Sequence, residues 1–396
     1  MEYKFSDNLK DLKPSAIREI LKFTSEPGYI PFAAGNPAPE TLPTDAVAAI
    51  LSDIMMEQPV DALQYSVTEG YAPLRKTLKD YLKSTQNIGR DSDELIITSG
   101  AQQVMSLSAA VLCDAGDTVV CEDPSFIGSL NAFRAAGLKL VGVPVEKDGM
   151  NVELLDKVLD AEKNVKFIYT IPNFQNPAGV CMSVQKRKAL YETAKRHGVM
   201  IVEDNPYGDT CFDGVCPPSV KSFDEDGIVI YAGSFSKVIS PGLRVGFALA
   251  PSAVISKMVV CKQTADVHTS ILSQMICYRF MTGGGYENHL SRNREIYRNK
   301  CGLMQSLLDR DMAPFIEYNK PSGGLFIWCR IKNGSDAESF CKKALERRVA
   351  VVPGSAFSVA PGGNGDCFRL NYSTPTDEQI VNGIGILGEV AKATLG

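Results

Sequence analysis

Histidine and regularly spaced cysteine are scarce in this chain of 396 residues, and both scarcities exclude kinds of site. The three histidines, His197, His268 and His289, show no His-x-x-x-His or other metal-ligand spacing. A zinc enzyme or a Ser-His-Asp hydrolase would have to build its site from these three residues. A cofactor that carries its own electrophile is therefore the better candidate, and we expect no metal.

Disulfides, membrane helices and a nucleic-acid surface are also not indicated. The eleven cysteines are odd in number and contain no Cys-x-x-Cys pair, which favours reduced thiols and a cytoplasmic protein. No stretch approaches the ~18 apolar residues that a membrane helix needs. The 46 acidic residues only slightly outnumber the 41 basic ones, so we expect neither a membrane nor a nucleic acid as a partner.

Short apolar runs rich in Val and Ile alternate with amphipathic stretches along most of the chain. Such runs are typical of buried strands, and the stretches between them, such as 184–196, are typical of crossover helices. The pattern therefore predicts an α/β fold with a mostly parallel sheet. The runs lie at residues 94–98, 118–121, 165–170, 199–203, 228–232 and 245–250.

The chain is longer than the roughly 250 to 300 residues at which a single core stops growing, so we expect two unequal domains. A long charged helix candidate at 287–309 follows three glycines at 283–285, which suit a boundary between domains. The C-terminal part then has the strand-helix-strand order of a small α+β domain. We predict an N-terminal segment at 1–43, a large domain at 44–284 and a small domain at 285–396.

A lysine stands just beyond a predicted strand, where ligands bind in open α/β sheets. Lys237 follows the run 228–232, and partial burial there would free a neutral amine to form a Schiff base with a cofactor aldehyde. The alternative is an ordinary solvated surface charge. Ser234, Ser236 and Arg244 lie in the same segment and offer hydroxyl groups and a phosphate clamp.

Polar residues also follow the two predicted strands at 165–170 and 199–203. Asp204 comes after the run 199–203 and could supply an anion to a pyridine nitrogen, although Asp-Asn-Pro is also an ordinary turn. Tyr207 and Asn176, the latter in a rigid loop rich in Pro and Gly, are candidates to hydrogen-bond a phenolic oxygen of the cofactor. The sequence leaves open whether the bond between Asn176 and Pro177 is cis.

Three further segments suit a cofactor that carries a phosphate and an aromatic ring, together with a substrate carboxylate. Backbone N–H groups of Ala101 and Gln102, where a strand turns into a helix, would form a phosphate site. Phe126 could stack on a cofactor ring, although a core position is the commoner place for a phenylalanine. Arg369, within a strand-like run at 368–372, could grip a carboxylate with two hydrogen bonds, or lie exposed on an edge strand.

In this order the motifs resemble those of fold-type I aminotransferases of class I/II, which use pyridoxal 5′-phosphate (PLP). The resemblance spans nearly the whole chain and is greatest to the 2-aminoadipate, kynurenine and aromatic aminotransferases. The matching stretches are SAIREI, FAAGNP, YSVTEG, TSGAQQ, YTIPNFQNP, EDNPY, SFSK and FRLN. One departure concerns Phe126, where relatives often carry tyrosine, so a stacking ring is kept but a hydroxyl is lost.

The resemblance implies a PLP-dependent aminotransferase (EC 2.6.1.-) with a PLP-transferase fold of type I. It would move an amino group between an L-amino acid (glutamate, 2-aminoadipate, aromatic or aliphatic) and a 2-oxo acid. Lys237, Asp204 and Tyr207 would be the catalytic residues. Lys237 would carry PLP, Asp204 would pair the ring nitrogen, and Asn176 and Tyr207 would hold the phenolic oxygen.

The resemblance also implies which residues bind the phosphate and which bind the substrate. The phosphate would be bound by Ala101, Gln102, Ser234, Ser236 and Arg244, together with Tyr65 of a neighbouring subunit in a homodimer with shared sites. Gly35, Asn176 and Arg369 would line the substrate cleft. Arg18 is a candidate to read a distal carboxylate, and its alternative is a charge on a helix surface.

Two alternatives remain open at this point. A β-lyase or a decarboxylase would use the same scaffold and the same cofactor. A non-catalytic effector-sensing domain of a transcription regulator also shares the fold, but the aminotransferase-like sequence begins near Ser15, so we do not expect a DNA-binding module.

Overall fold

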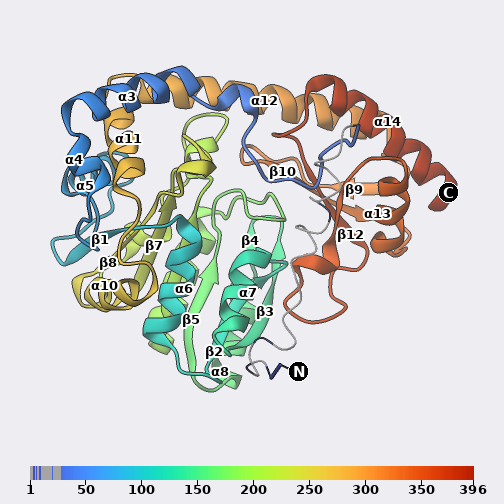
Figure 1. Ribbon diagram of the computed structural model, residues 1–396. Helices are drawn as coiled ribbons and strands as arrows, with labels where there is room; N and C mark the ends of the chain where they lie inside the picture. The colour runs from blue at the N-terminus through green and yellow to red at the C-terminus, as the bar shows by residue number, and fades with distance from the viewer. Residues whose placement is uncertain (1–2, 5, 7–8, 10–19, 21–27) are drawn as a thin grey trace.

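The computed structural model describes residues 3–4, 6, 9, 20 and 28–396. Its larger part is built on an eight-stranded sheet in the order β1-β8-β7-β6-β5-β2-β3-β4, which Figure 1 shows on the left. The strands are β1 (Asp93–Thr98), β2 (Thr118–Asp123), β3 (Lys139–Glu146), β4 (Gly149–Met150), β5 (Val165–Thr170), β6 (Met200–Asn205), β7 (Val229–Ser234) and β8 (Gly246–Pro251).

Five neighbouring strands of this sheet, β7, β6, β5, β2 and β3, run parallel. Strand β8 is antiparallel to both of its neighbours, β1 and β7. The predicted α/β fold with a mostly parallel sheet is therefore confirmed, and every strand predicted for it is present within two residues at each end.

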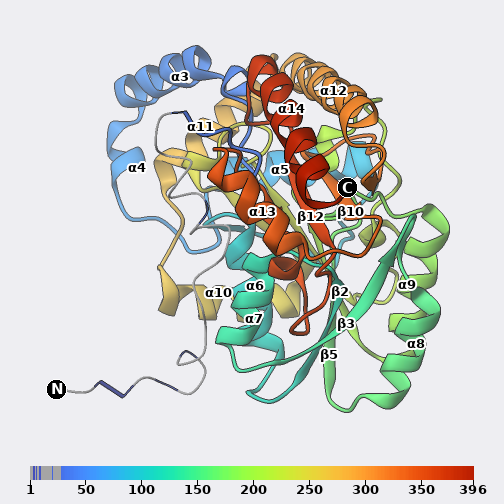
Figure 2. The same ribbon diagram turned by 90° about the vertical axis from the view of Figure 1, so that its right-hand side faces the viewer.

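Helices cover both faces of the large sheet. Successive strand residues point to opposite sides, and apolar side chains on both sides are buried under these helices. In β1, Ile96 packs in one core cluster with Val104, whereas Leu95 packs in another with Leu78. Figure 2 shows the first face covered by α6 and α7 and the opposite face by α8 and α9. The helices of this part are α3 (Thr44–Glu57), α4 (Pro59–Leu63), α5 (Ala72–Gln86), α6 (Ala101–Leu112), α7 (Ile127–Ala135), α8 (Val152–Ala161), α9 (Val184–His197), α10 (Ser252–Ala265) and α11 (Ile271–Thr282).

A second, antiparallel sheet of four strands lies at the C-terminal end in the order β11-β12-β10-β9. The predicted long helix is α12, which runs along the top of the molecule in Figure 1 and packs on α14. The elements are α12 (Tyr286–Asp311), β9 (Ile316–Tyr318), β10 (Phe326–Ile331), α13 (Ala337–Glu346), β11 (Val352–Pro353), β12 (Cys367–Asn371) and α14 (Asp377–Thr394). The predicted domain limits remain predictions.

The segment before α3 lies against the small sheet. Ile30 forms a parallel bridge with Val349, and the backbone N–H of Asn371 donates to the carbonyl oxygen of Phe32 at 2.9 Å. This pairing places Gly35 and its neighbours between the two sheets.

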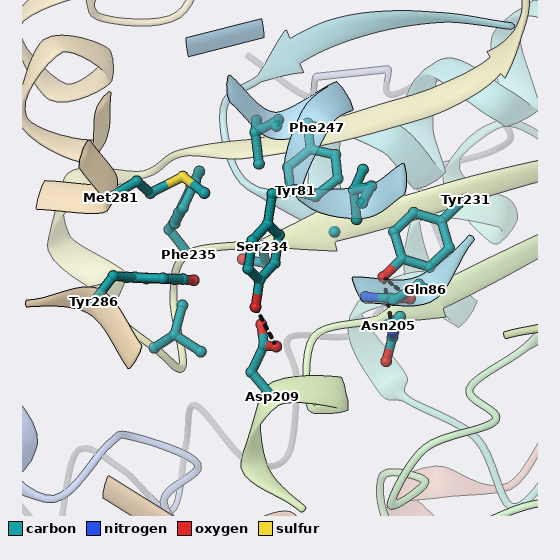
Figure 3. A pocket seen from close by; sticks show the side chains of 14 residues that line it. Tyr81, Gln86, Asn205, Asp209, Tyr231, Ser234, Phe235, Phe247, Met281 and Tyr286 are labelled. Atoms are coloured by element: carbon teal, nitrogen blue, oxygen red, sulfur yellow. Dashed lines mark hydrogen bonds between the residues drawn. The ribbon is translucent and has the colours of Figure 1, made fainter. Parts of the chain in front are cut away.

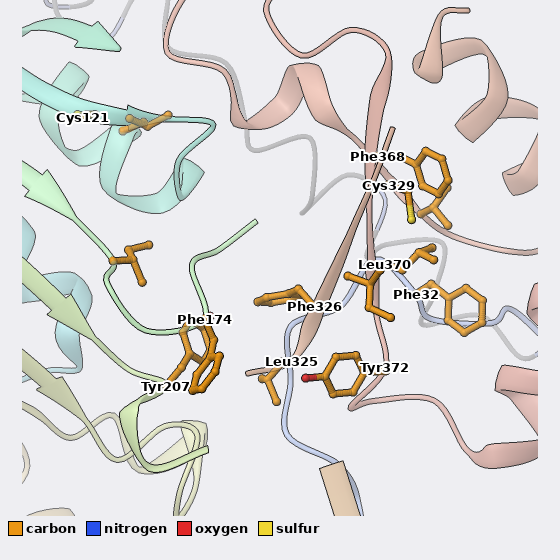
Figure 4. Close-up of a cluster of buried hydrophobic side chains, with 14 of the residues drawn as sticks. Phe32, Cys121, Phe174, Tyr207, Leu325, Phe326, Cys329, Phe368, Leu370 and Tyr372 are labelled. Carbon is orange, nitrogen blue, oxygen red and sulfur yellow. The ribbon is translucent and has the colours of Figure 1, made fainter. Parts of the chain in front are cut away.

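The largest core cluster joins the two sheets. Figure 4 shows Phe174 and Tyr207 from the large part facing Leu325 and Phe326 from the small part, with Tyr372 to the right of these two. All five side chains are buried. Such continuous apolar packing keeps the two parts in a defined relation and so stabilises the cavity between them. Among the residues that the structure describes, none of the helices has the length and apolar character needed to cross a membrane.

Candidate active site

A cavity of about 780 Å³ lies at the carboxyl ends of the parallel strands and is closed from the other side by the small sheet. All but two of the residues predicted from the sequence line it. They are Gly35, Ala101, Gln102, Phe126, Asn176, Asp204, Tyr207, Ser234, Ser236, Lys237, Arg244 and Arg369. The structure therefore brings together residues spread over more than three hundred positions (35 to 369).

A second cavity, shown in Figure 3, is far smaller. It measures about 20 Å³ and lies beside β7 among Tyr81, Asp209 and Tyr231. A space of this size holds about one water molecule. It is too small for an amino acid, so the large cavity is the candidate active site.

Lys237 projects into the large cavity from the segment after β7. Its Nζ donates to the carbonyl oxygen of Gly35 at 2.6 Å. Burial, together with the positive charges of Arg369 and Arg244, lowers the pKa of Lys237 to about 8. A lysine with this pKa is partly neutral near pH 7, as a nucleophile or a general base must be.

Asp204, at the end of β6, presents an unpaired carboxylate oxygen. Its Oδ2 accepts a hydrogen bond from Tyr169 at 2.8 Å, whereas Oδ1 is buried and has no partner among the described residues. Burial raises the pKa of Asp204 to about 6. A buried acceptor without a donor is costly, and a protonated ring nitrogen is the kind of donor that would satisfy it.

The N-terminus of α6 and Arg244 together form a candidate phosphate site, called the phosphate cradle below. Helix α6 begins at Ala101, after Gly100 with φ +78°, and a side chain at Gly100 would collide with the guanidinium of Arg244. Arg244 donates to the carbonyl oxygen of Ser99 at 3.2 Å, and Ser234 and Ser236 line the same end of the cavity. Free N–H groups at a helix N-terminus and a guanidinium are an ordinary phosphate site.

Arg369 lies on an inner strand, so the alternative of an exposed edge strand is wrong. Strand β12 is flanked by β11 and β10, and the residue is 2% exposed. Its guanidinium donates to Asn176 Oδ1 and to the carbonyl oxygen of Ala33, both at 2.8 Å. The guanidinium carbon lies 4.1 Å from the ring centre of Phe326, and Nε is buried without a partner among the described residues. The free N–H suits a carboxylate.

Two aromatic side chains complete the cavity. Tyr207 is buried, hydrogen-bonds Asn176, and has a pKa raised above its usual value by burial. Phe126 precedes α7, lines the cavity and also packs at the edge of the main core. Phe126 is therefore a core aromatic that also borders the cavity, and its stacking on a cofactor ring stays a prediction. The Asn176–Pro177 bond is cis.

The two remaining predicted residues are not part of the cavity. Tyr65 is 83% exposed, and its ring contacts that of His268 at 5.9 Å. Tyr65 does not line the cavity of its own chain, and its predicted role toward the phosphate of a neighbouring subunit stays a prediction. Arg18 lies outside the described residues, and so does most of the SAIREI motif.

Sequence reasoning missed several residues that shape the site. Phe326 packs on Arg369, Tyr169 and Ser129 connect to Asp204, and Gly246 touches the phosphate cradle. Tyr169 stood within the quoted YTIPNFQNP motif, so its hydroxyl near the buried end of a strand was a usable signal. Phe326 and Gly246 carried no comparable signal.

Comparisons with known proteins agree with this geometry. The family model "Aminotransferase class I and II" matches residues 27–387. An aromatic-amino-acid aminotransferase of Thermococcus litoralis is 37% identical over 99% of this chain and 94% of its own length. A 2-aminoadipate transaminase of Thermus thermophilus is 40% identical over 97% and 95%. The crystal structure of a Pyrococcus horikoshii kynurenine aminotransferase, in complex with PMP and kynurenine, superposes with a TM-score of 0.95, at 35% identity, over 99% and 98%.

This chain belongs to the class I and II aminotransferases. The family, the fold type, the aminotransferase class of enzyme and the PLP cofactor predicted from the sequence are thereby confirmed.

Proposed function

We propose that this aminotransferase moves an amino group between an L-amino acid and a 2-oxo acid in the large cavity, with Lys237 as the residue that carries PLP. The observation that carries the proposal is the convergence of three groups on one cavity. These are the lysine amine of Lys237, the unpaired carboxylate oxygen of Asp204 and the buried guanidinium of Arg369. Each suits a different part of the cofactor and substrate.

Different residues would bind the ring nitrogen, the phenolic oxygen and the phosphate of PLP. When bound, PLP supplies a ring that withdraws electrons from the substrate Cα. Asp204 would hold a proton on the ring nitrogen, and Asn176 and Tyr207 would hydrogen-bond the phenolic oxygen. The phosphate would be held by Ala101, Gln102, Ser234, Ser236 and Arg244.

Lys237 would also move the proton of the reaction. Its amine, when not joined to PLP, would be the base that takes the proton from the substrate Cα. A pKa of about 8 places this amine close to neutral pH, and a general base is most effective when its pKa lies near the pH of the reaction.

Arg369 would bind the substrate α-carboxylate and so orient Cα toward Lys237. The cavity wall includes the apolar side chains of Phe126, Ile171 and Phe326 and also the amides of Asn36 and Asn131. This wall supports aromatic and aliphatic amino acids, and also kynurenine and 2-aminoadipate, whose polar ends the amides can meet. Arg18 would add a charge for dicarboxylic substrates.

We further propose a homodimer in which Tyr65 reaches the phosphate of the neighbouring subunit. An exposed apolar surface on α3, α4 and the following loop supports it. Its residues include Met56, Val60, Leu63 and Tyr65, which are 70% to 83% exposed. Apolar side chains gathered in this way usually mark an interface.

Borohydride reduction of the PLP-loaded protein, followed by peptide mapping, tests the proposal. The reduced phosphopyridoxyl group is expected on Lys237. It should be lost in Lys237→Ala and kept in Lys257→Ala, a control at an exposed lysine of α10. A group found on another lysine would contradict the proposed site.

A panel of amino donors then tests the reaction. Each accepted donor should convert bound PLP to PMP and release the matching 2-oxo acid. Release of CO₂, or of pyruvate with ammonia, would instead point to a decarboxylase or a β-lyase.

A further inference from the structure

Two fully buried residues, Ser129 and Tyr169, connect to the carboxylate of Asp204. Ser129 Oγ donates to the hydroxyl oxygen of Tyr169 at 2.8 Å, and the Tyr169 hydroxyl donates to Asp204 Oδ2, also at 2.8 Å. We infer that Tyr169, oriented by Ser129, is a positioning residue that keeps Asp204 charged and directs its free oxygen, Oδ1, at the ring nitrogen of PLP. The inference rests on the role proposed for Asp204.

The direction of these hydrogen bonds follows from the chemistry of the hydroxyl groups. A tyrosine hydroxyl has one proton to donate and accepts through its oxygen. Because Ser129 supplies a proton to that oxygen, the tyrosine proton is left for Asp204. Burial raises the pKa of Tyr169 well above its usual value, so the hydroxyl is protonated and is a donor at neutral pH.

The backbone holds the three side chains in place. Tyr169 of β5 pairs in register with Val202 of β6, two residues before Asp204, so the two side chains lie on the same face of the sheet. Ser129 comes from α7, which covers that face. Phe133, one turn further along α7, contacts the Tyr169 ring edge-on at 5.4 Å. The tyrosine is therefore fixed by a strand on one side and a helix on the other.

Asp204 needs such a donor because its surroundings favour the protonated acid. Burial raises the pKa of Asp204 to about 6, and the hydrogen bond from Tyr169 opposes this rise. Glu122 of β2 is a second buried acid close by, with a pKa raised to about 7 mainly by burial and slightly by Asp204. Tyr207 lies on the chain just after β6, and Lys237 and Arg369 line the same cavity as Asp204.

Glu122 does not compete with Asp204 for the tyrosine. Its two oxygens accept from the Thr170 hydroxyl at 2.8 Å, the backbone N–H of Ile171 at 3.0 Å and the Gln175 amide at 3.1 Å. Tyr169 is thus the donor reserved for Asp204, and Asp204 Oδ1 is left for the cofactor.

The affinity of the apoprotein for PLP, measured as a function of pH, tests this inference. Tyr169→Phe keeps the ring and removes the hydroxyl. We expect PLP binding to weaken by about 10- to 100-fold, the range for a hydrogen bond to a charged group. On lowering the pH, affinity should also fail at a higher pH than in the parent protein, because Asp204 without its donor takes up a proton more readily. Ser129→Ala should shift both quantities in the same direction by less.

Two controls separate the possible failures. Tyr297→Phe removes an equally buried hydroxyl that contacts Thr41 at 3.1 Å, outside the cavity, and it should change neither quantity. Asp204→Asn should weaken PLP binding at least as much as Tyr169→Phe. If Asp204→Asn binds PLP normally, the proposed role of Asp204 is wrong. If Asp204→Asn weakens binding but Tyr169→Phe does not, or if Tyr297→Phe gives the same shift, the inference about Tyr169 is wrong.

Discussion

Asn176 Oδ1 accepts a hydrogen bond from the guanidinium of Arg369 at 2.8 Å, and this bond joins the two sheets across the cavity. Asn176 stands in the loop after β5, whereas Arg369 is on β12. The same guanidinium is bound by the carbonyl oxygen of Ala33 and by the ring of Phe326. Segments from three parts of the chain therefore fix the group that is proposed to hold the substrate carboxylate.

Replacing Arg369 by lysine should impair substrate binding rather than cofactor binding. A lysine keeps the charge but lacks the planar fork that grips a carboxylate while also reaching Asn176. We expect kcat/KM for the amino donor to fall by roughly 100-fold, as when about 3 kcal/mol of charged hydrogen bonding is lost, with PLP affinity nearly unchanged. Steady-state kinetics on Arg330→Lys, at a half-exposed arginine of β10, is the control. An unchanged kcat/KM in Arg369→Lys would contradict the assignment.

The rate at which PLP attaches to the apoprotein should depend on pH through Lys237. Burial and the nearby positive charges disfavour the ammonium form, so the proton leaves at about pH 8 instead of near 10.5. Only the neutral amine attacks the aldehyde. The rate should therefore rise with pH and level off above about 8, and in Arg369→Met, which removes one positive charge, the midpoint should move to higher pH. Stopped-flow absorbance would measure both curves, and a midpoint near 10 in the parent protein would refute the effect of burial.

Much of this site could be predicted because its residues follow strands that are easy to recognise. The run at 165–170 is strand β5 without any shift, and the long charged helix was placed within two residues of α12. Asp204 stands at the end of β6, and Lys237 follows β7 by three residues. The rule that ligands bind at the carboxyl ends of parallel strands then brings them together without knowledge of the strand order.

The rest depends on contacts between distant segments, which local patterns do not encode. That β8 lies between β1 and β7, antiparallel to both, follows from the whole packing of the sheet. Phe326 looks like any core residue until Arg369 is placed over it. Gly246 likewise looks like an ordinary glycine at the start of a strand, and only the folded chain shows what it touches.

Gly246→Ala should weaken PLP binding although Gly246 does not line the cavity. A Cβ at this position would lie 2.5 Å from the backbone nitrogen of Ala101 and 2.6 Å from the carbonyl carbon of Gly100. Such contacts would push the start of α6 away and displace the N–H groups of the phosphate cradle. We expect at least a roughly 10-fold increase in the dissociation constant of PLP, as for the loss of about 1.4 kcal/mol. Gly385→Ala, where nothing lies within 4 Å of the new Cβ, should bind PLP normally; equal affinities for the two variants would argue against the contact.

Lys221 should contribute to stability and not to PLP binding. Its buried Nζ donates to Asp93 at 3.0 Å and to Asp224 at 2.8 Å. Lys221→Met leaves two buried carboxylates without their cation, which costs about 3 to 5 kcal/mol. Urea unfolding of the apoprotein should show this loss, whereas Lys139→Met, which breaks an exposed pair with Glu162, should cost about 1 kcal/mol or less. Similar losses in the two variants would show that burial of the pair is not decisive.

The exposed apolar surface of α3 and α4 should be the contact between two subunits. Val60→Glu and Leu63→Glu each place a charge on this surface without disturbing the core, because both side chains are at least 70% exposed. Burying an unpaired charge at an interface is costly, so light scattering should show the mass of these variants falling from twice 43.0 kDa toward that of one chain. Activity should fall with it, since Tyr65 would no longer reach a neighbouring phosphate. Val215→Glu, at an apolar residue that is 80% exposed elsewhere on the molecule, should remain a dimer, and a parent protein that is monomeric and fully active would contradict the proposal.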